Sequence, residues 1–202
     1  CGFGLFLRQF VGKRNFHLSG IDISKIATNA ARRYIPNIYQ GDILSFQPDK
    51  LYDVVLVFEL IEHVLDPSLL LRKLNSLLRH GGDLIITTPD ASNFTFRLLK
   101  RRWPGIHPSV HNFYFTPHTL ERMCHKAGFK KIRISRSNFI NRSIRHARSR
   151  LFSILTQSGL SSISLQGQGF FIKLGGLDRL VLPFLGGGRI MAIFGKTRVY
   201  KG

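Results

Sequence analysis

Hydrophobic positions along the chain alternate between two spacings, one typical of buried strands and one typical of helices. The run from Asp53 to Phe58 is almost wholly aliphatic and β-branched, which is the composition of a parallel strand buried on both faces. The segment Pro67 to Leu78 instead repeats leucine at positions 70, 71, 74 and 78, which is the spacing of one helical face. Strands that alternate with helices of about ten residues indicate βαβ units. We therefore predict an α/β fold in one domain over residues 1–202.

Capping and breaking residues give the other boundaries. Ser24 suits a helix N-cap, Pro89 ends a strand, and Gly128 suits a helix C-cap. The predicted helices are Phe3–Gly12, Lys25–Arg33, Pro67–Leu78 (ended by Gly81 and Gly82) and Thr116–Ala127, and the predicted strands are Phe16–Asp22, Ile38–Ile43, Asp53–Phe58, Asp83–Pro89, Ile132–Ile134 and Ile190–Lys196.

Residues 139–188 lack this regularity, and we interpret them as a basic and apolar insertion before the last strand. Basic and aliphatic residues mix from Ile140 to Leu155, and serine and glycine are frequent from Ser158 to Gly169. The arginines at positions 142, 145, 148 and 150 are spaced for one side of an amphipathic helix. Basic helices of this kind lie on anionic membranes, although a solvated basic face without a partner fits the same pattern.

The charged residues are distributed unevenly between the two halves of the chain. The formal net charge is +19, and most acidic residues precede residue 91, so the later half is strongly basic. Such asymmetry indicates an anionic partner, which is a small substrate, a membrane surface or nucleic acid.

Cysteine usage and hydropathy narrow the location of the protein. The two cysteines, Cys1 and Cys124, form no disulfide framework and no metal-ligand cluster, and we predict no metal site. Since this usage suits a reducing compartment and no apolar run reaches the ~18 residues of a membrane span, we expect a cytoplasmic location with peripheral membrane contact as an option.

Polar residues at predicted strand ends are the candidates for chemistry, because open α/β sheets bind ligands there. Asp22 ends a strand, and a carboxylate in this place accepts the ribose hydroxyls of a nucleoside cofactor, in an NAD-binding domain as well as in others. Gly2 and Gly4 precede a predicted helix, where glycine allows close approach of the backbone to a ligand. His63 follows the buried strand and titrates near neutral pH, so it is a candidate general base.

Two segments carry a resemblance to a known family. The sequence FELIEHVLDP at residues 58–67 and the sequence GIDIS at residues 20–24 resemble class I S-adenosylmethionine (SAM)-dependent methyltransferases, especially the ubiquinone-biosynthesis O-methyltransferase-like group. The resemblance covers residues 1–135 and 189–197. It implies a Rossmann-like, mostly parallel sheet with flanking helices, with Ile190–Lys196 at its edge, and SAM as the cofactor.

The resemblance also assigns roles to residues. Cys1, Gly2 and Gly4 would be the second half of a glycine-rich loop, whose acidic residue and preceding central strand are expected to be missing from an N-terminally truncated copy. Neighbouring strands would then be unpaired, and we expect poor solubility. The other implied cofactor-binding residues are Asp22 with Ile23 at the ribose, Asp42 and Ile43 at the adenine, and Phe58 and Glu59 near the methionine part.

Two histidines are candidate catalytic residues, each with a structural alternative. His63 would take a proton from a hydroxyl nucleophile, or with Glu62 would only shape the loop beside the cofactor. His111 and Tyr114 would touch the acceptor, or would pack under a lid with Thr116 as a helix cap. Methyl transfer demands mainly that the nucleophile be positioned in line with the sulfonium.

The functional hypothesis is methyl transfer from SAM to an oxygen, less readily a nitrogen or carbon, of a glycan, a lipid or a quinone-like small molecule. An Asn/Asp-Pro-Pro-aromatic sequence, a Walker loop and a nucleophile elbow are all missing from the sequence, so nucleic-acid amino methylation, phosphate binding by a P-loop and serine hydrolysis are disfavoured. The alternative is a non-catalytic basic module that binds an anionic membrane or, less favoured, nucleic acid.

Overall fold

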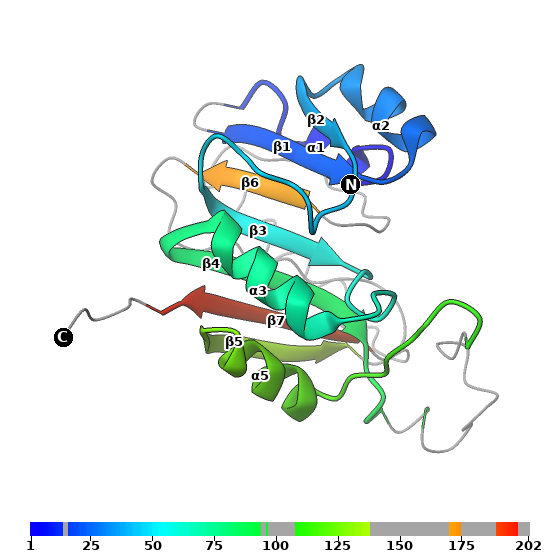
Figure 1. Ribbon diagram of the computed structural model, residues 1–202, viewed down its shortest axis with the longest axis vertical. Helices are drawn as coiled ribbons and strands as arrows, with labels where there is room; N and C mark the ends of the chain where they lie inside the picture. Colours follow the sequence, from blue (N-terminus) through cyan, green and yellow to red (C-terminus); the bar gives the residue numbers. More distant parts are fainter. Residues whose placement is uncertain (14–15, 94–95, 97–107, 138–169, 175–188, 198–202) are drawn as a thin grey trace.

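The computed structural model describes residues 1–13, 16–93, 96, 108–137, 170–174 and 189–197, which form a single seven-stranded sheet with helices on both faces (Figure 1). The strands are β1 Phe16–Asp22, β2 Asn37–Gln40, β3 Tyr52–Phe58, β4 Leu78–Pro89, β5 Phe129–Ser137, β6 Phe170–Leu174 and β7 Arg189–Lys196, in the spatial order β2-β1-β6-β3-β4-β7-β5. The helices are α1 Leu5–Arg8, α2 Lys25–Arg32, α3 Pro67–Leu77 and α5 Pro117–Lys126.

Most strands of the sheet share one direction. β1 runs parallel to β2, and β3 runs parallel to β4. β6 is antiparallel to both β1 and β3, and β7 is antiparallel to both β4 and β5, so only β6 and β7 run against the other five strands. The prediction of an α/β fold with a mostly parallel sheet is confirmed.

The two faces of the sheet are covered by different helices. Phe6 and Leu7 of α1 and Ala31 of α2 pack on one face with Leu56 and Phe58 of β3. On the other face, α3 and α5 lie in front of the sheet in Figure 1. Successive residues of β3 therefore alternate between two apolar cores, and all seven are buried. Each fully buried aliphatic side chain of such a strand contributes about 1.5–3 kcal/mol.

β6 occupies the place between β1 and β3 where the sequence predicted no strand from this chain. Its backbone pairs on one side with Phe16–Ser19 and on the other side with Val54–Leu56. The sheet is therefore continuous across its centre, and the expectation that β1 and β3 lack a partner here is not met. Apart from β6, the predicted insertion at 139–188 lies outside the described residues.

The sequence had suggested that the last strand lies at the edge of the sheet, and this prediction is wrong. β7 lies between β4 and β5, and β5 is the edge strand. Ile190 to Phe194 are all buried, which requires neighbours on both sides, whereas Lys130, Lys131 and Arg133 of β5 are exposed. The Lys196 ammonium donates to the carbonyl oxygens of Asn75 and Leu78 at 3.0 and 2.9 Å, which ties the end of β7 to the C-terminus of α3.

Local capping signals were read correctly, while two glycine-containing segments were not. Ser24 caps α2, and Thr116 caps α5 in a capping box. Helix α1 begins two residues later than predicted, because the left-handed Gly4 (φ 69°) precedes it, and it ends at Arg8, four residues before the predicted end. β4 begins directly after α3, so Gly81 and Gly82 lie within the strand instead of ending the helix. The pairing of β3 with β4 shifts register here, because Tyr52 pairs with Leu78 and Val54 pairs with Asp83. The extra residues of β4, which include both glycines, form a bulge-like irregularity.

Two further findings concern membrane-spanning helices and the two cysteines. Among the described residues, no helix combines the length and the apolar character needed to span a bilayer. Cys1 and Cys124 are both buried and free, and burial raises the pKa of the Cys124 thiol well above its ordinary value.

We predict that Gly4→Ala destabilises the protein more than Gly12→Ala. Both glycines have a left-handed φ, 69° and 76°, so both variants carry the same backbone strain of about 1–2 kcal/mol. A Cβ on Gly4 would lie 2.9 Å from the Cβ of Ala31, whereas a Cβ on Gly12 meets nothing within 4 Å. Overpacking adds roughly 1–3 kcal/mol to the cost of Gly4→Ala. Urea unfolding of both variants measures this difference, and equal losses would contradict the packing reason.

Candidate functional site

The carboxyl ends of β1 and β3 are level with one another across β6. Phe171 of β6 pairs with Ser19 of β1 and with Val55 of β3. Each of these residues lies three positions before the end of its strand, so Asp22 and Phe58 stand at the same height. Since they are two strand spacings apart, about 10 Å separates the two strand ends. The polar residues that follow β1 and β3 therefore belong to one edge of the sheet.

Asp22 anchors the glycine-containing segment to the end of β1. The Cys1 nitrogen and the Gly2 N–H each donate to Asp22 Oδ2 at 2.7 Å, and the Ser24 N–H donates to Oδ1 at 2.9 Å. Although partial burial acts to raise it, these hydrogen bonds hold the pKa of Asp22 below its ordinary value. The carboxylate keeps one acceptor position on Oδ1, because an ionised carboxylate offers about four.

The predicted adenine segment lies beside Asp22. Gly41 N–H donates to the carbonyl oxygen of Asp22 at 3.0 Å, which joins the ends of β1 and β2. Asp42 is exposed, and its Oδ1 accepts the Leu44 N–H at 2.9 Å, which fixes the turn. Ile43 is partly buried against the core under α3. The structure thus brings Gly2, Asp22 and Asp42 to the carboxyl ends of β1 and β2.

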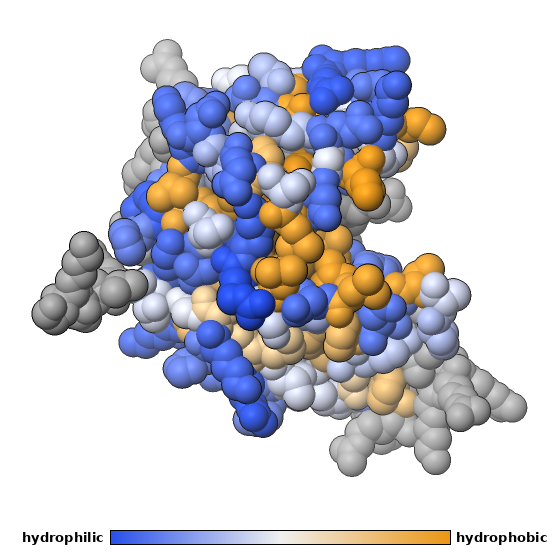
Figure 2. Space-filling model, in the orientation of Figure 1, coloured by the Kyte–Doolittle hydropathy of each residue, from blue (hydrophilic) through white to orange (hydrophobic). Residues whose placement is uncertain are grey.

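Exposed apolar residues border this edge. Ile23 follows β1 and is 78% exposed, and Leu65 in the segment after β3 is 88% exposed. Figure 2 shows apolar surface on this side of the molecule, above and below a notch in the outline. Exposed apolar groups at the mouth of a notch are suited to cover the flat face of a ligand ring.

Phe58 and Glu59, which the resemblance places near the methionine part of the cofactor, lie at the carboxyl end of β3. The Phe58 ring is 1% exposed and packs edge-on against Phe6, with centroids 5.4 Å apart. The ring therefore packs in the core against α1, directly after the glycine segment. Glu59 has a φ of 49°, and its carboxylate accepts the Thr87 hydroxyl at 2.9 Å and pairs with Arg189 at 3.3 Å. Both residues hold the strand end in shape.

Glu62 is the most deeply buried acid of this edge. It is 1% exposed, and its Oε2 accepts the Thr88 hydroxyl at 3.0 Å. Its Oε1 is buried without a hydrogen-bond partner in the described part of the chain. Burial, and next the negative charge of Glu59, raise the pKa of Glu62 to about 7.

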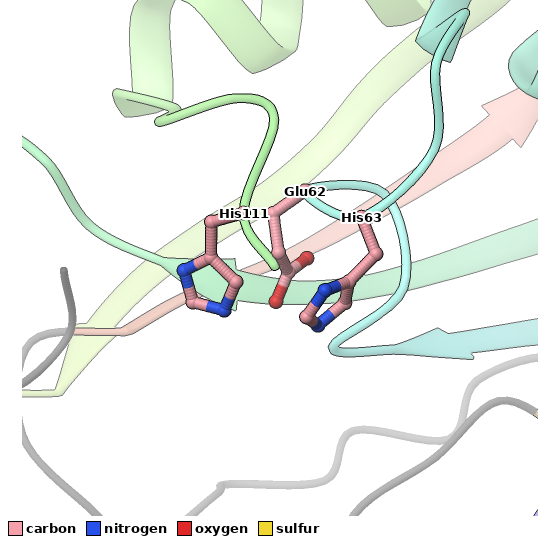
Figure 3. A group of neighbouring side chains, drawn as sticks. All are labelled: Glu62, His63 and His111. Carbon is pink, nitrogen blue, oxygen red and sulfur yellow. The ribbon is translucent and has the colours of Figure 1, made fainter. Parts of the chain in front are cut away.

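His63 and His111 are neighbours, although 48 positions apart in sequence. Their rings lie 4.7 Å apart at 71°, with the Glu62 carboxylate between them (Figure 3). His63 Nδ1 lies 2.8 Å from the Val110 carbonyl oxygen, which only accepts, so Nδ1 carries the proton and Nε2 carries the lone pair of the neutral ring.

Asn112 fastens the segment of His111 to the segment of His63. Its backbone N–H donates to the Glu62 carbonyl oxygen at 2.8 Å, and its side chain donates to the His63 carbonyl oxygen at 2.8 Å. Sequence reasoning missed Asn112, Thr88 and Arg189. Thr88, at a strand end, was the one with a readable signal, because polar residues at strand ends are candidates for a site.

The donor atoms at this edge divide into two sets. The first set is the glycine segment with Asp22 and Asp42, which suits a nucleoside cofactor. The second set is Glu62, His63 and His111, which offer one metal-ligand atom each within 4.8 Å of one another. Both sets lie at the carboxyl edge, on either side of β6.

Comparison with known proteins indicates the kind of domain that this chain forms. A family model described as a methyltransferase domain matches residues 1–134. A ubiquinone biosynthesis O-methyltransferase of Aeromonas salmonicida (strain A449) is 33% identical over an alignment of 147 positions, which covers 63% of this chain and 59% of that protein. The chain thus spans about three-fifths of the length of this curated relative.

Solved structures show the same fold. A SAM-dependent methyltransferase from Thermotoga maritima, described as a possible histamine N-methyltransferase, has a TM-score of 0.58 at 21% identity and covers 98% of this chain and 78% of its own. Magnesium protoporphyrin IX methyltransferase from Synechocystis PCC 6803, with bound SAH, has a TM-score of 0.57 at 14% identity and covers 98% and 71%. At these identities the likeness concerns the fold alone.

We predict that the Asp22 carboxylate stabilises the protein at neutral pH and loses this effect in acid. Its folded pKa is lowered, so the contribution is present above the unfolded pKa and disappears as pH falls through the folded pKa. Asp22→Asn should therefore lower the free energy of unfolding at pH 7, with a difference from the unsubstituted protein that shrinks below about pH 4. Urea unfolding across pH measures this, with the exposed Asp49→Asn as control. A difference independent of pH would contradict it.

Proposed function

The chain belongs to the methyltransferase domain family, and on this premise we propose that it transfers a methyl group from S-adenosylmethionine to an oxygen of a small molecule. The observation that carries the proposal is the shared height of Asp22 and Phe58, which brings a nucleoside-binding set and a set of imidazoles to one edge. A glycan, a lipid or a quinone-like compound is the proposed class of acceptor, and the name of the Aeromonas salmonicida relative supports transfer to oxygen.

The residues present fit the cofactor. Asp22 has an acceptor position left for a ribose hydroxyl, and the exposed Asp42 carboxylate supplies an acceptor for an amino group. Ile23 is exposed beside them and offers an apolar surface to a purine ring. Gly4, which tolerates no side chain against Ala31, keeps the glycine segment close to α2. When bound, the cofactor supplies a methyl group that its sulfonium already activates.

The acceptor is proposed to bind beside Glu62, His63 and His111. The lone pair of His63 Nε2 is available to hold a hydroxyl group, because Nδ1 is committed to Val110. Asn112 keeps both histidine segments together, so the acceptor meets a preformed set of groups. Since in-line transfer depends chiefly on position, this rigidity is what the chain contributes to the rate.

A second candidate function is peripheral binding to an anionic membrane, and a specific surface favours it. Within residues 108–137 the only acidic side chain is Glu121, which pairs with Lys131 at 2.8 Å. Ile132 of β5 is 47% exposed beside basic side chains. A surface that combines an apolar side chain with basic groups is suited to contact an anionic lipid surface. The exposed basic residues of α5 and β5 are Arg122, Lys126, Lys130, Lys131, Arg133 and Arg136.

We expect S-adenosylhomocysteine to bind the protein saturably and Asp22→Ala to weaken that binding roughly 10- to 150-fold. The range corresponds to the loss of a hydrogen bond to a charged group, about 1.5–3 kcal/mol. Calorimetric titration of the unsubstituted protein, Asp22→Ala and the exposed control Asp49→Ala measures the effect. Unchanged affinity in Asp22→Ala would remove the ribose assignment, and no saturable binding by any of the three would count against the proposed function.

For the second candidate, we expect vesicles containing phosphatidylglycerol to bind the protein and pure phosphatidylcholine vesicles not to bind it. Arg133→Glu on β5 should weaken the binding by at least about fivefold, because each basic side chain near an anionic surface contributes about 1 kcal/mol. Arg33→Glu, on an exposed position next to α2, is the matched control. Co-sedimentation measures both variants. Equal binding by the two variants, or preference for RNA over vesicles, would contradict this surface.

A further inference from the structure

The exposed side of α5 forms an open hollow with the start of β5, away from the carboxyl ends of β1 and β3. Figure 1 shows α5 in front of β5 at the lower edge of the sheet. The hollow has a volume of about 320 Å³, which lies near the lower end of the roughly 300–1,000 Å³ of small-molecule sites. Its lining consists of polar residues, most of which donate hydrogen bonds. These residues are His118, Glu121, Arg122, His125, Lys126 and Lys131.

Positive charge exceeds negative charge in this hollow. Glu121 is the single carboxylate of the lining, and it pairs with Lys131 at 2.8 Å. Arg122 and Lys126 are exposed, and neither forms an ion pair within the described part of the chain. These two cations are four positions apart on α5, a spacing at which like charges on a helix repel each other. An anion bound between them would relieve this repulsion.

Lys131 faces the hollow because of its register on β5. It pairs with Phe194 of β7, which lies in the same core as Leu120 of α5. Arg133 pairs instead with Ile193, which lies in the core on the opposite face of the sheet. Since paired residues of neighbouring strands share a face, Lys131 and Arg133 lie on opposite faces. The register shift between them explains why residues two positions apart do so.

The composition of the hollow favours a compact ligand that carries phosphate. A phosphate monoester has about −1.5 to −2 charges at pH 7 and strong acceptor oxygens. Guanidinium and ammonium groups match this charge, and each neutral imidazole adds one N–H donor. The lining has no aliphatic side chain to enter a bilayer, and no phenylalanine, tyrosine or tryptophan on which a nucleic-acid base could stack. Ile132 and Arg133, on which the membrane candidate rests, lie outside this lining.

We propose that this hollow binds the phosphate groups of a soluble, phosphorylated small molecule, with Arg122, Lys126 and Lys131 as its charged contacts. The two histidines of the lining supply further N–H donors, and the Glu121 carboxylate holds the Lys131 ammonium in place. The site is distant from the proposed cofactor site, because four strands separate β5 from β1, which ends in Asp22. Binding here does not depend on methyl transfer.

Calorimetric titration with inorganic pyrophosphate in metal-free buffer tests the site on the full chain. Salt at about 0.15 M screens charges more than about 8 Å apart, so that general attraction is suppressed. We expect saturable binding of one equivalent, which Arg122→Gln should weaken roughly tenfold or more through the loss of charge-assisted hydrogen bonds. Arg133→Gln is the matched control, because it removes the same charge from the same surface strand but on the opposite face of the sheet. Its affinity should stay close to that of the unsubstituted protein.

Glu121→Gln is the second test, because it should change the affinity in the opposite direction. Removing the carboxylate removes its repulsion of the bound anion, so pyrophosphate should bind roughly fivefold more tightly. A gain of affinity is a result that partial unfolding of a variant does not produce. An unchanged or weaker affinity in Glu121→Gln would contradict the placement of the anion in this hollow.

Three other results would overturn the proposal. The first is equal losses in Arg122→Gln and Arg133→Gln, or no saturable binding of pyrophosphate. The second is Arg122-dependent binding of phosphatidylglycerol vesicles without binding of pyrophosphate, because the hollow would then belong to a membrane surface. The third is competition between pyrophosphate and S-adenosylhomocysteine, which are expected to bind independently. Because S-adenosylhomocysteine is also titrated alone, failure of this site and failure of the proposed function are separate results.

Discussion

The backbone pairing of β6 with β1 and β3 is the interaction on which the remaining architecture depends. Without it, the unit of β1, β2, α1 and α2 would join the rest of the sheet through side-chain packing alone. With it, the hydrogen-bond ladder continues from β2 to β5. A ladder also fixes register, which packing does less strictly, and register is what sets Asp22 and Phe58 at one height.

This shared height explains why the site is divided as it is. The groups proposed for the cofactor, Asp22 and Asp42, follow β1 and β2. Those proposed for the acceptor follow β3 or lie in the segment before α5. Each half is rigid for its own reason. Asp22 is held by backbone donors, and the histidine segments are held by Asn112. The sheet between them fixes the distance that separates the two sets of groups.

Local signals in the sequence predicted local structure well. Ser24 and Thr116 cap their helices, and the run to Phe58 is a buried strand, as expected. Features that depend on distant parts of the chain were missed. β6 comes from a segment without periodicity, and the meeting of His63 with His111 depends on Asn112, whose role no neighbouring residue signals. The packing of the Phe58 ring against α1 was not predicted either, because strand composition does not tell which face a ring turns to.

The order of strands has a consequence for synthesis on the ribosome. β6 fills the centre of the sheet and β7 separates β4 from β5, yet each follows in the sequence both of the strands with which it pairs. Until these last strands emerge from the exit tunnel, β1, β3, β4 and β5 expose open edges, and folding awaits contacts of long sequence separation. Nascent chains of this protein are therefore expected to need protection by chaperones until β7 has left the ribosome.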